Sequence, residues 1–96
     1  PWFREYVFRQ LEVAKARGAK QVILEIDSPG GFVDDSLEVA TKMRTLEWAH
    51  TVAYVPREAL SGAAFVALGC QEIIVGPDAR LGDAGPVIFG KDAQFR

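Results

Sequence analysis

The 96-residue sequence predicts an α/β domain with a mainly parallel sheet built from βαβ units. Amphipathic helical segments alternate with short apolar runs that are rich in β-branched residues. The connections between these segments are short, which favours right-handed crossovers between parallel strands. A third observation is Ser61, which opens an almost wholly apolar segment. Because ligands of such sheets bind beyond the carboxyl ends of the strands, this serine is placed where function is expected.

The first half of the chain predicts a helix, a strand and a second helix. Apolar residues recur at helical spacing over residues 3–14, and Gly18 is placed to end that helix. Residues 21–26 form a nearly continuous apolar run, which is typical of a buried parallel strand. The run ends in an Asp-Ser-Pro-Gly-Gly turn at residues 27–31. Helical spacing returns over residues 33–43, with two aspartates near the positive N-terminus of the helix.

The second half continues the alternation. Residues 51–55 predict a strand that Pro56 ends. Residues 59–70 are interpreted as a loop that enters a third helix, and this helix should be buried because it is apolar on nearly all sides. A strand, an extended glycine-rich loop and a short strand are then expected at residues 72–75, 81–86 and 87–89.

Composition narrows the function classes. A net charge of −2 without a basic face argues against a nucleic-acid partner. One cysteine, Cys70, and one histidine, His50, cannot supply an intrachain disulfide or a structural zinc site. We expect no metal and no cofactor. The longest stretch without charged residues, 59–71, is too short to cross a bilayer. The chain starts at Pro1 and stops at Arg96 after a polar run, so we expect an incomplete domain.

The turns at residues 27–31 and around Ser61 predict a site for acyl transfer. This chemistry needs a nucleophilic oxygen, a base, and two N–H donors that face the tetrahedral oxyanion. Ser61 supplies the oxygen, and the N–H groups of Gly62 and of Gly30 or Gly31 are candidate donors. Glycines also allow an extended peptide to lie against the loop as an added strand, which predicts a polypeptide substrate.

These segments resemble the ClpP/crotonase superfamily and, within it, the membrane-associated NfeD-type and SppA-type serine proteases, with the NfeD type the most similar. The likeness is carried by residues 18–19, 24–31, 51–55, 59–68 and 77–86. It implies a ClpP/crotonase-like fold in which residues 1–96 are a single partial peptidase domain, with its N- and C-terminal parts outside the chain. It also places Ser61 on the nucleophile, and Gly62, Gly30 and Gly31 on the oxyanion hole.

The sequence departs from the family pattern in two places. The family more often has one residue between the serine and the glycine, whereas here Gly62 precedes Ala63. Ala84 stands where the Clp protease proteolytic subunit has its histidine. The NfeD and SppA types use a Ser-Lys dyad, and their lysine lies some tens of residues beyond the serine. This implies a base outside this chain, and we expect Lys91, the only lysine after Ser61, to be a solvated loop residue.

Structural interpretations compete with the functional ones. Ser61 is a candidate N-cap, and the paired glycines are candidate tight-turn residues. Asp27 is expected to be a structural carboxylate at a strand end, Cys70 a core residue, and Asp83 a loop-capping residue with substrate contact as the other possibility. His50 precedes its strand, at the end opposite Ser61, so we do not expect it to act as the base.

Two other functions remain open. A crotonase-type acyl-CoA enzyme uses the same oxyanion hole, although hydratases place a glutamate on the following helix and residues 59–71 contain no acidic residue. A non-catalytic scaffold would keep the fold without the base. For the peptidase, the resemblance implies a homo-oligomer in a prokaryote that associates with the membrane through segments outside this chain, and substrates that are hydrophobic or membrane-associated polypeptides.

Overall fold

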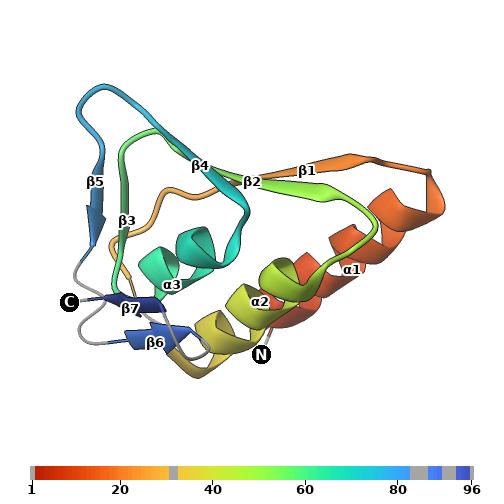
Figure 1. The fold of residues 1–96 in the computed structure, drawn as a ribbon, viewed down its shortest axis with the longest axis horizontal. Helices are drawn as coiled ribbons and strands as arrows, with labels where there is room; N and C mark the ends of the chain where they lie inside the picture. Colours follow the sequence, from red (N-terminus) through yellow and green to blue (C-terminus); the bar gives the residue numbers. More distant parts are fainter. Residues whose placement is uncertain (1, 31–32, 83–86, 90–92, 96) are drawn as a thin grey trace.

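The computed structural model describes residues 2–30, 33–82, 87–89 and 93–95. In chain order the elements are α1 (Trp2–Ala16), β1 (Gln21–Glu25), α2 (Val33–Thr45), β2 (His50–Val55), β3 (Glu58–Leu60), α3 (Gly62–Gly69), β4 (Glu72–Val75), β5 (Arg80–Gly82), β6 (Val87–Phe89) and β7 (Ala93–Phe95). The predicted α/β class is confirmed, and the helices and strands of the first half follow the predicted alternation (Figure 1).

A parallel sheet in the order β1-β2-β4 forms the centre of the molecule. Figure 1 shows α1, α2 and α3 on the same side of this sheet. The period-two alternation of β1 explains the arrangement, since Val22 and Leu24 pack against the core whereas Ile23 between them is exposed. The side of the sheet away from the helices has no covering layer in the described part of the chain.

A second, smaller parallel sheet pairs β3 with β5, at one end of the central sheet (Figure 1). Ser28, just after β1, adds an isolated parallel bridge to Ala59 of β3. The loops predicted at residues 59–60 and 81–82 were therefore wrong, because both segments are strands. Three-residue strands are too short to show a periodic pattern, and only their pairing with distant segments makes them regular. A last strand, β7, was not predicted either, and it pairs antiparallel with β6.

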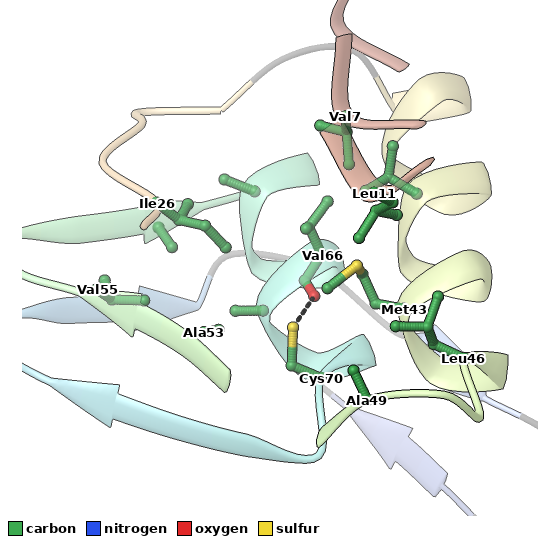
Figure 2. Close-up of a cluster of buried hydrophobic side chains, with 14 residues drawn as sticks. Val7, Leu11, Ile26, Met43, Leu46, Ala49, Ala53, Val55, Val66 and Cys70 are labelled. Atoms are coloured by element: carbon green, nitrogen blue, oxygen red, sulfur yellow. Dashed lines mark hydrogen bonds between the residues drawn. The ribbon is translucent and has the colours of Figure 1, made fainter. Parts of the chain in front are cut away.

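The hydrophobic core lies between the central sheet and the three helices (Figure 2). Its fully buried members include Met43 of α2, Val55 of β2 and Val66 of α3. Helices α2 and α3 approach so closely that a Cβ at Gly69 would lie 2.5 Å from the Ala40 carbonyl oxygen. None of the helices in the described residues is long and apolar enough to cross a membrane.

Cys70 closes α3 and is buried in this core, as the sequence predicted. Its thiol Sγ donates to the Val66 carbonyl oxygen at 3.6 Å (Figure 2). Burial raises the pKa of the thiol to about 11. Because the thiolate is the reactive form, this cysteine is held in its inert form at neutral pH.

Candidate active site

Ser61 lies between β3 and α3, at the N-cap of the helix. Its backbone has φ 55° and ψ −123°, and it is the one non-glycine residue with positive φ among the residues that the structure describes. This conformation costs an L-residue on the order of 1–3 kcal/mol. The hydroxyl makes no capping hydrogen bond. Ser61 therefore occupies the N-cap position that the structural interpretation gave it, but its side chain does not satisfy the helix.

Hydrogen bonds on both sides hold the Ser61 backbone in this strained conformation. Its N–H donates to the Gly82 carbonyl oxygen at 3.0 Å, which extends the pairing of β3 and β5 by one residue. Its carbonyl oxygen accepts from the N–H of Ala64 at 2.9 Å and of Phe65 at 3.4 Å. The backbone of Ser61 is thus bonded in both directions, while its side chain is partly exposed.

Gly30 meets Ser61 directly. Its φ is +124°, and a Cβ built on it would lie 2.8 Å from the Ser61 Cβ and 3.1 Å from the Leu60 carbonyl oxygen. A real Cβ does not approach another atom that closely, so glycine is the residue that this position accepts. The two turns that the sequence predicted to converge are thus in contact. Gly31, the second glycine of the pair, lies outside the described residues.

The turn that carries Gly30 is attached to β3 by Ser28. The Ser28 N–H donates to the Glu58 carbonyl oxygen at 2.9 Å, and its carbonyl oxygen accepts from the Leu60 N–H at 3.1 Å. Its side-chain Oγ accepts from the Gly30 N–H at 3.1 Å. The Gly30 N–H, a predicted oxyanion donor, is therefore already engaged within the turn in this structure.

The N–H of Gly62, the other predicted donor, opens α3. The first N–H groups of a helix have no carbonyl partner within it, and the helix dipole adds partial positive charge there. Gly62 is also buried. An oxyanion placed at this helix start would replace water as the partner of these N–H groups.

Two ion pairs surround the small sheet that holds Ser61. The Arg57 guanidinium donates to Asp27 Oδ2 from Nε at 2.9 Å, and Arg80 Nη2 donates to Glu58 Oε1 at 2.7 Å. The hydrogen bond to Asp27 raises the pKa of Arg57. Both arginines are largely exposed, so each pair contributes little to stability. Asp27 lies just after β1, at the strand end where the sequence placed it, and it pairs with Arg57.

His50, the one histidine of the chain, is engaged elsewhere. His50 begins β2, and its Nε2 lies 2.9 Å from Glu72 Oε1. That hydrogen bond raises the pKa of the exposed imidazole. The described residues contain no cluster of ligands that would hold a metal ion. Asp83, Ala84 and Lys91 lie outside the described residues.

Sequence reasoning missed two residues of the site. Gly82, which accepts the Ser61 N–H, was counted only as part of a glycine-rich loop, and Ser28 only as part of a turn. A serine followed by proline and glycine is a signal for a side-chain-closed turn, so Ser28 was open to prediction. The Gly82 contact depends on the pairing of two three-residue strands and has no local signal.

Comparison with known proteins shows which protein family this chain matches. The model of the N-terminal domain of NfeD1b matches residues 2–94. A candidate protease of Synechocystis sp., slr0021, is 30% identical over 95% of this chain, and the membrane protein NfeD1b of Bacillus subtilis is 35% identical over 85% of it. A candidate signal peptide peptidase, SppA, of Enterococcus faecium is 27% identical over 82% of the chain.

A solved structure shares the fold. It is a lysine-to-alanine mutant of the 1510-N membrane-bound stomatin-specific protease in complex with a substrate peptide, with a TM-score of 0.79 and 22% identity over 98% of this chain. The chain spans 33%, 18% and 24% of the three relatives and 45% of the solved chain. The described residues thus correspond to a part of each of these longer proteins.

Proposed function

Because the chain belongs to the family of NfeD1b N-terminal domains, we propose that it is the nucleophile-bearing part of a serine peptidase. Ser61 attacks the carbonyl carbon of a peptide bond. The resulting oxyanion is held by the Gly62 N–H and by an N–H of the glycine turn, where Gly31 is the remaining candidate because the Gly30 N–H is bonded to Ser28 Oγ. The relatives named as peptidases and the shared fold support this reaction class.

The observation that carries the proposal is the strained backbone of Ser61 against Gly30. A serine that served only as a helix cap would take an extended backbone conformation and bond its hydroxyl to the first turn. Ser61 does neither. Sharp, strained turns between a strand and a helix present catalytic serines in other hydrolases, because they expose Oγ beside the N–H groups that open the helix. In this proposal, the strain at Ser61 has the same effect.

The general base in this proposal is a lysine from outside the chain. A desolvated lysine has a lowered pKa and takes the serine proton as a neutral amine. The solved neighbour supports a lysine-dependent reaction, since its substrate-bound form carries a lysine-to-alanine substitution. Lys91 stays a solvated loop lysine in this proposal.

The substrates that we propose are hydrophobic or membrane-associated polypeptides. The Bacillus relative is named a membrane protein, the Enterococcus relative a signal peptide peptidase, and the solved neighbour a membrane-bound protease specific for stomatin. A membrane location would come through other parts of the protein, and self-assembly would bring several copies of the site to one surface.

Labelling of the full-length protein with a fluorophosphonate tests the nucleophile. We expect the wild type to become labelled and Ser61→Ala to lose the label completely, because the probe reacts with an activated serine. Thr45→Ala is the matched control, since it removes another hydroxyl, one that bonds to the Thr41 carbonyl oxygen at 2.8 Å at the end of α2, and should keep the label. Equal labelling of wild type and Ser61→Ala would refute the proposal, and an unlabelled wild type would favour the scaffold function.

A further inference from the structure

We propose that Ser28 is a positioning residue for the nucleophile, whose side-chain hydroxyl fixes the glycine turn against Ser61. The proposal rests on the proposed function, because it assigns Ser28 a part in the reaction of Ser61. Ser28 touches neither the substrate nor the reacting atoms. It acts through Gly30.

The backbone of Ser28 is fixed to the strand that leads into the nucleophile. Its N–H and carbonyl oxygen bond to Glu58 and Leu60, at 2.9 and 3.1 Å, on the two sides of Ala59. Leu60 directly precedes Ser61. β3 thus fixes the position of Ser28 and also leads directly into Ser61.

The side chain of Ser28 then sets the turn. Its Oγ lies 3.1 Å from the Gly30 nitrogen and accepts the N–H. Pro29 lies between them, and its ring restricts φ to about −65°. A fixed proline and a closed side-chain hydrogen bond leave the turn few alternatives, and the result is the φ of +124° at Gly30. Ser28 is half-buried, so water competes only partly for its hydroxyl.

The closed turn lies directly on the nucleophile. The Cβ position of Gly30 would be 2.8 Å from the Ser61 Cβ, so a small movement of Gly30 changes the space around the serine side chain. Three contacts therefore run in series, from β3 to Ser28, from Ser28 to Gly30, and from Gly30 to Ser61. Ser28 Oγ is the one side-chain hydrogen bond in this series among the described residues.

The hydrogen bond from the Gly30 N–H to Ser28 Oγ also affects the oxyanion hole. While Ser28 Oγ holds the Gly30 N–H, that N–H is not free to bind an oxyanion, and Gly30 contributes by its missing Cβ. If the Gly30 N–H were instead the working donor, removal of the Ser28 hydroxyl would release it and raise the rate. The two roles of Gly30 therefore predict opposite effects of Ser28→Ala on the reaction rate. The rate falls if Ser28 positions the turn, and it rises if the Gly30 N–H is the working donor.

The test uses the full-length protein with Ser28→Ala, Ser28→Thr and the control Thr45→Ala. We expect Ser28→Ala to lower kcat for a peptide substrate and the rate of fluorophosphonate labelling on the order of tenfold, with KM unchanged, because misplacement of reacting groups acts on the chemical step. Ser28→Thr keeps an acceptor oxygen and should restore both rates. Thr45→Ala, which loses a comparable hydroxyl-to-backbone bond, should leave both rates unchanged. An unchanged or faster Ser28→Ala would overturn the proposal.

Amide hydrogen exchange separates this proposal from the proposed function. We expect Ser28→Ala to speed exchange at the N–H of both Gly30 and Ser61, and Ser28→Thr to restore slow exchange. This readout does not require catalysis. Faster exchange at Gly30 with no change at Ser61 would show that the turn does not position the serine. A further outcome is a wild type that does not label, together with faster exchange at both amides in Ser28→Ala. It would refute the proposed peptidase function but would still show that Ser28 positions Ser61.

Discussion

At the scale of single residues, the contact of Ser61 with Gly30 organises the site. Ser61 has the backbone of a sharp turn, and Gly30 lies where any side chain would collide with it. The strain of about 1–3 kcal/mol is a sizeable fraction of the net stability of a small domain, and it is concentrated at one residue. Hydrogen bonds to Gly82, Ala64 and Phe65 keep it there.

Gly30→Ala tests this contact in the full-length protein. We expect the free energy of unfolding to fall by about 1–3 kcal/mol and fluorophosphonate labelling to be lost, because the new Cβ is both strained at positive φ and pressed on Ser61. Urea denaturation and the labelling assay measure the two effects.

Gly18→Ala is the matched control for Gly30→Ala. Gly18 also has positive φ, +78°, but no atom lies within 4 Å of its Cβ position. Gly18→Ala should lower the free energy of unfolding by the backbone strain alone, about 1 kcal/mol, and the variant should keep the fluorophosphonate label. Similar losses of labelling in Gly30→Ala and Gly18→Ala would show that the contact of Gly30 with Ser61 is not needed for the reactivity of the serine.

At the scale of elements, the sequence predicted those that have their own pattern. The helical spacing of α1 and α2, the apolar runs of β1, β2 and β4, and the small apolar residues of α3 are local signals, and each predicted the element that forms. The predicted burial of β1 was wrong, because its alternate residues are exposed on a sheet face that no helix covers in the described part of the chain. The Gly30 and Ser61 contact was predicted as well, because parallel strands bring their carboxyl ends to one edge.

The remaining elements depend on partners that are distant in the sequence. β3 and β5 have three residues each and become strands by pairing with each other. The same limit holds for burial, since Tyr6 and Leu37 fit the helical spacing but are 52% and 42% exposed. Spacing gives the face of a helix, whereas the width of the buried stripe depends on what packs against it.

Cys70, at the end of α3, predicts how the free energy of unfolding depends on pH. The pKa of Cys70 is raised from 9.0 to about 11, so the folded state keeps the proton over a range in which the unfolded state loses it. The stability that the raised pKa of this thiol contributes is fully present below pH 9, and it falls by roughly 2–3 kcal/mol as the pH rises through 11. Urea denaturation between about pH 8 and 11 measures the slope.

Cys70→Ala is the control for that slope. The variant lacks the titrating thiol, so its stability should fall less steeply over the same pH range, although its stability at neutral pH is lower because a buried atom is lost. Parallel slopes for wild type and variant would contradict a raised pKa at Cys70.

At the scale of the whole molecule, the helices cover one side of the central sheet. Ile23 of β1 is 61% exposed and Ile74 of β4 is 47% exposed, and each alternates with a neighbour that packs on the core. Elsewhere, a groove of about 440 Å³ lies between α1 and β1, away from the site, and Ser61 is not among its lining residues.

The uncovered sheet face predicts the solution behaviour of the 96-residue chain. We expect the chain to self-associate as its concentration rises, because exposed β-branched residues on a sheet are poorly accommodated by water. The double variant Ile23→Thr, Ile74→Thr should reduce this association in sedimentation velocity. Leu37→Thr, which removes an apolar side chain of α2 that is 42% exposed, should not. An equal effect of the two variants would show that the sheet face is not the contact surface.

The bond from the Ser61 N–H to the Gly82 carbonyl oxygen bears on the order of events during synthesis. A nascent chain that has left the ribosome only as far as α3 has no acceptor for that amide. Its serine is then held only by the bonds from the N–H groups of Ala64 and Phe65. Under the peptidase function that we propose, the nucleophile is therefore fully placed only after β5 has left the ribosome and paired with β3.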